Sequence, residues 1–210
     1  VDQVSDPRRA WLYNAGQRRV RRAPQVAYDG PGQGSDGTRF ADELDMLNGA
    51  PDRFDWKLVG KKEMYIPYNS YRLISPELSY KDVHLQGHPN QDYTRYELHR
   101  VWEIEATLAE GKRHSYSRRV FYIDEDSWGI AVKDQYDGQG NLWRVGESHM
   151  LQFYQVDVPW TATETNIDLN DGRYLTLGLT NEERGGGYTF GEPMRRRDYE
   201  TSALRRLGKR

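Results

Sequence analysis

The chain alternates strictly between two sets of side chains over residues 94–108, which read TRYELHRVWEIEATL. One set is Thr94, Tyr96, Leu98, Arg100, Trp102, Ile104, Ala106 and Leu108, and the other is Arg95, Glu97, His99, Val101, Glu103, Glu105 and Thr107. A period of two residues is typical of a β-strand with one buried face. At about 3.3 Å per residue the strand would be about 50 Å long, far beyond the usual length. We therefore expect a sheet that bends strongly or closes towards a barrel, with a hollow on one side.

Short turns join this stretch to the strand-like segments that follow it. The turns are Glu110-Gly111-Lys112, Asp124-Glu125-Asp126-Ser127 and Asp137-Gly138-Gln139-Gly140. Such connections join antiparallel strands, because a parallel crossover needs a dozen or more residues. The predicted fold class is α+β, mainly β: a curved antiparallel sheet of about seven or more strands, forming an unclosed barrel with short helices over its concave face.

One segment has the apolar spacing of a short amphipathic helix. Its positions i, i+4 and i+7 are apolar, its other face is acidic, and Gly49 and Pro51 end the pattern. We expect a helix over residues 38–47 that packs on the concave face as a lid. The lid residues are Phe40, Asp42, Glu43, Leu44, Asp45 and Leu47.

The size and composition of the chain restrict its class. A chain of 210 residues that begins with Val1 is expected to be a processed piece, either a single domain over residues 1–210 or the C-terminal part of a larger one. It has no apolar run near the roughly 18 residues of a membrane helix, and its lack of cysteine excludes disulfides and a cysteine nucleophile. The net charge of -2 argues against a nucleic-acid binder. The basic clusters at 18–22 and 195–197 are either solvated surface or a docking face for an anionic lipid or an acidic partner.

No motif in the chain predicts a catalytic, metal or cofactor site. The serine nucleophile elbow, the phosphate loop and the dinucleotide fingerprint are all absent from the sequence. His84 and His88 have a spacing that binds zinc on a helix, but Gly87 and Pro89 disfavour a helix there. We therefore predict no metal and no cofactor, and nothing in the sequence supports an enzyme.

The long strand supplies the candidate ligand-binding residues. They are Tyr96, Leu98, Arg100, Trp102, Ile104 and Leu108. An unpaired charge on this apolar side would be costly, so Arg100 needs a partner. The acidic face of the lid could provide it, as could an anionic group of the ligand; the alternative is an arginine that reaches the rim of the hollow.

Four stretches of the chain resemble the DUF1329 family. They are WLYNAGQRRVRRAP (11–24), DELD (42–45), GAPDRFDWKLVGKKEM (49–64) and YIDEDSW (122–128). This family consists of bacterial proteins of unknown function that are related to the LolA/LolB-like carriers of outer membrane lipoproteins.

The resemblance implies a periplasmic protein whose unclosed barrel receives acyl chains on a concave face covered by helices. It also implies lipid binding or lipoprotein sorting, and a transporter of the resistance-nodulation-division (RND) type as a partner. In LolA-like carriers an inward arginine helps to hold the lid, and Arg100 is the candidate here. We expect a periplasmic binding or carrier protein for a lipid or other hydrophobic ligand. The alternatives are an enzyme acting on an envelope lipid or glycan, which a close His and carboxylate pair in a cleft would indicate, and a structural partner of a membrane transporter.

Overall fold

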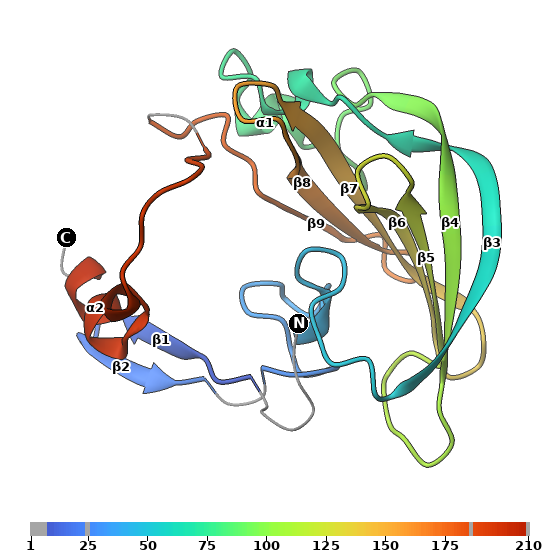
Figure 1. Cartoon of the computed structure of the whole chain (residues 1–210), viewed down its shortest axis with the longest axis horizontal. Helices are drawn as coiled ribbons and strands as arrows, with labels where there is room; N and C mark the ends of the chain where they lie inside the picture. Colours follow the sequence, from blue (N-terminus) through green and yellow to red (C-terminus); the bar gives the residue numbers. More distant parts are fainter. Residues whose placement is uncertain (1–7, 24–25, 185–186, 209–210) are drawn as a thin grey trace.

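The computed structural model describes residues 8–23, 26–184 and 187–208, so that Pro24 of the first family stretch lies outside the described residues. The largest element of the described chain is one curved sheet of seven strands, with neighbours in chain order (Figure 1). The strands are β3 (Phe54–Pro67), β4 (Tyr96–Leu108), β5 (Arg118–Asp124), β6 (Ile130–Tyr136), β7 (Leu142–Phe153), β8 (Val158–Asp168) and β9 (Tyr174–Leu177). All neighbours pair antiparallel. The predicted fold class, a mainly β protein with an unclosed antiparallel sheet, is confirmed.

The remaining elements are short. A separate hairpin near the start of the chain consists of β1 (Trp11–Asn14) and β2 (Arg19–Arg22). The helices are the 3₁₀ turns η1 (Ala41–Glu43), η2 (Tyr71–Ile74) and η3 (Arg196–Tyr199) and the α-helices α1 (Tyr80–Val83) and α2 (Thr201–Leu207). Among these described helices, none is long and apolar enough to cross a membrane.

The buried side of β4 changes along the strand. Ala106 is fully buried in a cluster with Phe54. Val101 points to the opposite side of the strand, yet it is also fully buried, in a cluster with Ile66. Leu98 shares the side of Ala106 and is 55% exposed. Strands twist in a right-handed sense, so the side that faces the core at one end of this 13-residue strand faces solvent at the other.

The paired strands β3 and β4 bend over one end of the sheet (Figure 1). The register shifts between Leu58 and Gly60 of β3, which marks a β-bulge, and bulges increase the local twist. Beyond this point Tyr68 forms a parallel bridge with Met150 of β7. Strands that are not neighbours therefore meet at this end, while residues 28–53 lie in the hollow at the other end (Figure 1).

Candidate functional site

Residues 28–53 lie across the concave face of the sheet, and we call them the cover segment. The helix predicted over residues 38–47 is wrong: this part of the segment contains only the turn η1. Asp45 and Met46 have φ values of 51° and 68°, in the left-handed region that a right-handed helix excludes. As a result Met46 is 2% exposed whereas Leu44 is 41% exposed. Of the predicted apolar stripe, Phe40 packs on the ring of Tyr116 and Leu47 on an apolar cluster of the sheet, whereas Leu44 points to solvent.

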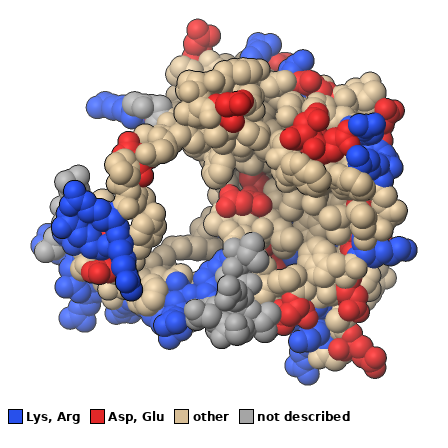
Figure 2. All heavy atoms as spheres, viewed as in Figure 1, with Lys and Arg blue, Asp and Glu red and all other residues tan. Residues whose placement is uncertain are grey.

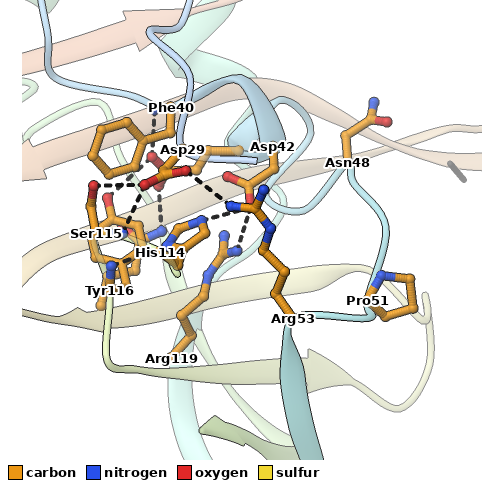
Figure 3. A network of polar contacts seen from close by, with 12 residues as sticks. Asp29, Phe40, Asp42, Asn48, Pro51, Arg53, His114, Ser115, Tyr116 and Arg119 are labelled. Carbon is orange, nitrogen blue, oxygen red and sulfur yellow. Dashed lines mark hydrogen bonds and ion pairs between the residues drawn. The ribbon is translucent and has the colours of Figure 1, made fainter. Parts of the chain in front are cut away.

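Asp42 joins the cover segment to the sheet through two buried side chains (Figure 3). Arg119 of β5 donates from Nη1 to its Oδ2 at 2.9 Å, and His114 lies 3.2 Å from the same oxygen. The Arg119 and His114 side chains are 1% and 0% exposed. Burial alone would raise the pKa of Asp42, but the charge of Arg119 and the contact with His114 outweigh it and lower that pKa.

Glu43 makes a second connection to the sheet and is fully buried. Its carboxylate accepts a hydrogen bond from Gln135 of β6 and another, at 3.1 Å, from the Tyr116 hydroxyl. Lys133 of β6 lies 3.6 Å from the same carboxylate and 3.4 Å from that of Glu164. Burial, followed by the charge of Glu43, raises the pKa of Tyr116. The tyrosine therefore serves as a hydrogen-bond donor at any ordinary pH.

Polar contacts also hold the two ends of the cover segment. Near its start, Arg144 of β7 donates to the carbonyl oxygen of Gly37 at 2.6 Å and to Asp168 at 3.0 Å. The two ends of the segment are joined to each other, because Arg53 pairs with Asp29 at 3.3 Å and its guanidinium lies 3.4 Å from the centre of the Tyr28 ring. Asp29 also accepts hydrogen bonds from the backbone and the hydroxyl of Ser115, both at 3.0 Å. The segment is therefore attached along its length by charged and polar groups.

Most of the buried side chains of the cover segment are polar, although the ring of Phe40 packs against those of Tyr116 and Trp143 and Leu47 packs on an apolar cluster of the sheet. The buried residues of the segment are Met46 and five polar or charged ones: Ser35, Thr38, Arg39, Asp42 and Glu43. Some groups in the interface have no hydrogen-bond partner among the described residues, namely Nε and Nη2 of Arg119 and Oδ1 of Asp42. A buried ionic network that is only partly satisfied stabilises less than a well-packed apolar interface.

An apolar cavity lies beside the end of the cover segment. Its volume is about 440 Å³, and its lining residues are Asp45, Leu47, Asn48, Gly49, Pro51 and Trp56. Trp56 is 38% exposed and stacks on Phe121 of β5, with ring centres 5.7 Å apart. Beneath them lies the cluster of Phe54, Ala106 and Phe121, against which Leu47, Leu108 and Ile130 pack. The cavity is large enough for a small organic ligand.

Arg100 does not make the contact that the sequence predicted. Its side chain is 60% exposed and pairs with Glu125 in the turn after β5. The prediction that it pairs with Asp42, Glu43 or Asp45 is wrong, because the twist of β4 turns this end of the strand away from the cover segment. Arg119 pairs with Asp42 and Lys133 with Glu43 instead.

The other predicted wall residues are spread along β4 rather than gathered in one hollow. Leu108 packs on the apolar cluster next to the cavity, and Ile104 pairs with Phe121 across the strands. Trp102 lies under the ammonium group of Lys61, 4.3 Å from its ring centre. Leu98 faces solvent, and the Tyr96 hydroxyl reaches Glu147 of β7 at 3.2 Å. That these residues contact a ligand stays a prediction.

The residues that hold the cover segment were not predicted from the sequence. Arg119, Lys133 and Arg144 lie on three consecutive strands and point to the concave face, as their register with one another shows. One signal for Arg119 was present, since it alternates with Phe121 and Ile123 in β5. That alternation does not place Arg119 under the cover segment, because the sequence does not show which side of β5 faces the concave surface.

Two further features bear on catalysis and metal binding. Ligand atoms of His99, Asp124 and Asp126 lie within 4.8 Å of one another. The buried Asp124 is already used, because Oδ1 contacts His99 at 2.8 Å and Oδ2 accepts two hydrogen bonds from Ser127. The apolar cavity and a second one of about 510 Å³ near Ser70 are lined by no histidine. The enzyme alternative therefore gains no support from these cavities.

The fold and the covered concave face define a class of curved-sheet proteins. A solved structure with this fold is a putative outer membrane lipoprotein-sorting protein domain from Vibrio parahaemolyticus, with a TM-score of 0.53 and 13% identity over 94% of this chain and 66% of that chain. A DUF1329 family protein from Desulfovibrio piger has a TM-score of 0.57 and 16% identity over 97% of this chain and 68% of that chain. Identities this low show similarity of fold alone.

The chain belongs to the DUF1329 family, described as "Protein of unknown function (DUF1329)", which matches residues 1–205. The resemblance seen in the sequence is thereby confirmed. The chain is 60% identical over 210 residues to "Uncharacterized protein PA3922" from Pseudomonas aeruginosa. The alignment spans all of this chain and 46% of that relative. That residues 1–210 form a single domain or the C-terminal part of a larger one stays a prediction.

Proposed function

We propose that this protein carries a lipid or another hydrophobic ligand, which enters the apolar cavity beside Leu47 and Trp56. The cover segment acts as its lid. The neighbour whose title names lipoprotein sorting supports an envelope carrier. The observation that carries the proposal is an apolar cavity at the edge of a segment that is held by ion pairs.

A lid must be able to leave the sheet without unfolding it. Separating an apolar interface exposes its whole area to water, at roughly 25 cal/mol per Å². The cover segment exposes Phe40, Met46 and Leu47 when it leaves. It also exposes Asp42, Glu43, Arg119 and Lys133, whose charges regain hydration when water enters. The apolar cluster around Phe121 belongs to the sheet and stays in place. Opening therefore costs less than the buried area of the segment suggests.

The compartment and the partner of the carrier follow from the family resemblance. We propose that it works in the periplasm and passes its ligand to or from a transporter of the RND type. In this proposal, the side chains of Ile104 and Leu108 extend the apolar wall along β4 from the cavity.

A fluorescent fatty-acid probe tests the proposed cavity. Replacing Trp56 with glutamate places a charge among Leu47, Pro51 and the apolar cluster, so the affinity for the probe should fall at least tenfold. Trp128→Glu is the matched control, because Trp128 is 70% exposed on the turn after β5. Circular dichroism on both variants checks that the sheet is intact.

Two results would contradict the carrier proposal. One is the absence of probe binding by the unmodified chain, and the other is equal probe affinity for folded Trp56→Glu and Trp128→Glu variants. Trp102→Glu tests whether the ligand contacts only the cavity beside Trp56 or also the face of β4 that holds Trp102. A loss of affinity in that variant would extend the site along β4, as the sequence alternation predicted.

A further inference from the structure

The two ends of the described chain form one small unit, which we call the terminal module (residues 8–23 and 187–208). The helix α2 packs on the hairpin of β1 and β2. Ala203 of α2 is 3% exposed, and a side-chain carbon added at Gly208 would lie 2.1 Å from the ring of Tyr13. Figure 1 shows α2, β1 and β2 together, apart from the large sheet.

The terminal module has the opposite charge to the rest of the molecule. It holds eleven arginines, no lysine and three acidic residues, a net charge of +8. Residues 26–184 hold 17 basic and 27 acidic residues, a net charge of −10. Figure 2 shows the concentration of basic side chains on this side of the molecule. The overall charge of -2 conceals this separation.

Nine of the eleven arginines of the module are available to a partner. These nine lie in β2 and the turn before it, in η3 and the residue before it, and in α2, and all nine are exposed: Arg18, Arg19, Arg21, Arg22, Arg195, Arg196, Arg197, Arg205 and Arg206. Within the described residues, none of these nine side chains forms an ion pair. Asp198 is used locally, since it accepts a hydrogen bond from the backbone of Arg195 at 2.9 Å. The charge of these nine arginines is therefore not neutralised by an ion pair within the described chain.

Large apolar and aromatic side chains are exposed among these arginines. Trp11, Tyr199 and Leu207 are 42%, 75% and 65% exposed. Together with Leu204 they line a shallow cavity of about 380 Å³ between β1 and α2. Tryptophan and tyrosine favour the interface between lipid and water, where one end of the ring is apolar and the other is wet.

We propose that the terminal module docks on the surface of a bilayer that contains anionic phospholipids. Arginine forms paired hydrogen bonds with phosphate oxygens, and Trp11 and Tyr199 would lie at the headgroup level. A bilayer fits better than a folded acidic protein. The arginines occupy both faces of β2 as well as a separate helix, so they do not line one groove of defined shape. Mobile lipid headgroups can adapt to such a surface. The proposal stands on the module alone and does not depend on what the apolar cavity holds.

Co-sedimentation of the 210-residue chain with vesicles tests this docking. The chain should bind vesicles of equal parts phosphatidylglycerol and phosphatidylcholine, and not vesicles of phosphatidylcholine alone. Replacing Arg18, Arg19, Arg21 and Arg22 with glutamine should weaken binding about fivefold per arginine, as expected for charges near an anionic surface. A second variant replaces the arginines at 195–197 with glutamine and leaves the hairpin unchanged. If the first variant weakens binding only because the hairpin misfolds, the second variant still tests the arginines. Added salt should release the wild-type chain.

The matched control replaces Lys57, Lys61, Lys62 and Lys112 of the remaining chain with glutamine, which removes the same charge elsewhere. Its vesicle affinity should stay within about threefold of wild type, because exposed charges far from the bilayer are screened. Equal weakening in the lysine and arginine variants, or no binding to the anionic vesicles, would overturn the proposal. A dimer at low salt that the arginine variants abolish and the lysine variant retains would also overturn the proposal. In that case the module would dock on the acidic part of a second copy of the chain. Probe binding to the apolar cavity should be unchanged in both arginine variants, which separates this test from that of the carrier.

Discussion

The ion pair between Asp42 and Arg119 should control whether the cover segment stays closed. Asp42→Asn keeps the size of the side chain but removes the charge that faces the buried guanidinium. Removing one partner of a buried pair costs about 3–5 kcal/mol. We expect about 3 kcal/mol, since the amide oxygen still accepts a hydrogen bond. If the sheet must unfold with the segment, this loss lowers Tm by about 10 °C.

Amide hydrogen exchange locates the effect. The amide of Ala41 donates to Gly30, that of Asp42 to Tyr28 and that of Asn48 to Asp42. These three amides report on the cover segment directly. A local opening made easier by about 3 kcal/mol accelerates their exchange about 100-fold, while amides of β5 and β6 keep their protection.

Arg100→Gln is the control for this experiment. Arg100 lies in an exposed pair with Glu125, and such pairs contribute about 0–1 kcal/mol. Its exchange pattern should match that of wild type. If Asp42→Asn leaves the protection of residues 38–48 as high as Arg100→Gln does, the ion pair does not hold the segment.

The pH dependence of the cover segment follows from the same pair. Folding lowers the pKa of Asp42 below its ordinary 3.8, so the unfolded chain binds the proton first as the pH falls. The stabilisation by the ion pair is complete above pH 3.8 and is lost as the pH falls through the lower pKa of Asp42 in the folded chain. Asp42→Asn should lack this acid transition.

Two further changes test the packing of the cover segment and of the sheet. Gly49→Ala places a methyl carbon 2.8 Å from Cβ of Asp42 and should cost about 1–3 kcal/mol in urea unfolding, whereas Gly138→Ala meets no atom within 4 Å; equal stability of the two variants would contradict the close approach. Burial lowers the pKa of His149 from 6.5 to about 4, so the unfolded chain takes up the proton first and wild type should lose about 2 kcal/mol between pH 7 and pH 5. His149→Gln should lose much less over the same interval, and an equal loss would show that His149 is not the group responsible.

Local patterns were enough to predict the sheet. The alternation over 94–108 and the Gly-containing turns at 110–112 and 137–140 depend only on neighbouring residues, and they led to an antiparallel meander, as found. The terminal arginines were also visible as clusters. Their joining into one module was not, because β2 and α2 are far apart in the chain.

The candidate site depends on contacts that no local pattern contains. Asp42 and Arg119 are 77 positions apart, and the sequence offers Arg100 as an equally good partner. Only the twist of β4 decides between them, by turning Arg100 to solvent and leaving Arg119 under the cover segment. The helix over 38–47 failed for a related reason. Asp42 and Glu43 bond to buried groups of the sheet, and this tertiary bonding, with the left-handed turn at Asp45 and Met46, overrides the helical spacing of Phe40, Leu44 and Leu47.

The sequence by itself determined which residues form strands, because side chains of alternating character favour an extended backbone with one apolar side. Only the tertiary structure decided which side of each strand is buried, and hence which charges meet beneath the cover segment. Twist accumulates along a long strand and turns the same side of β4 from the core at Ala106 to solvent at Leu98. Strict alternation in the sequence does not show how far the strand rotates along its length.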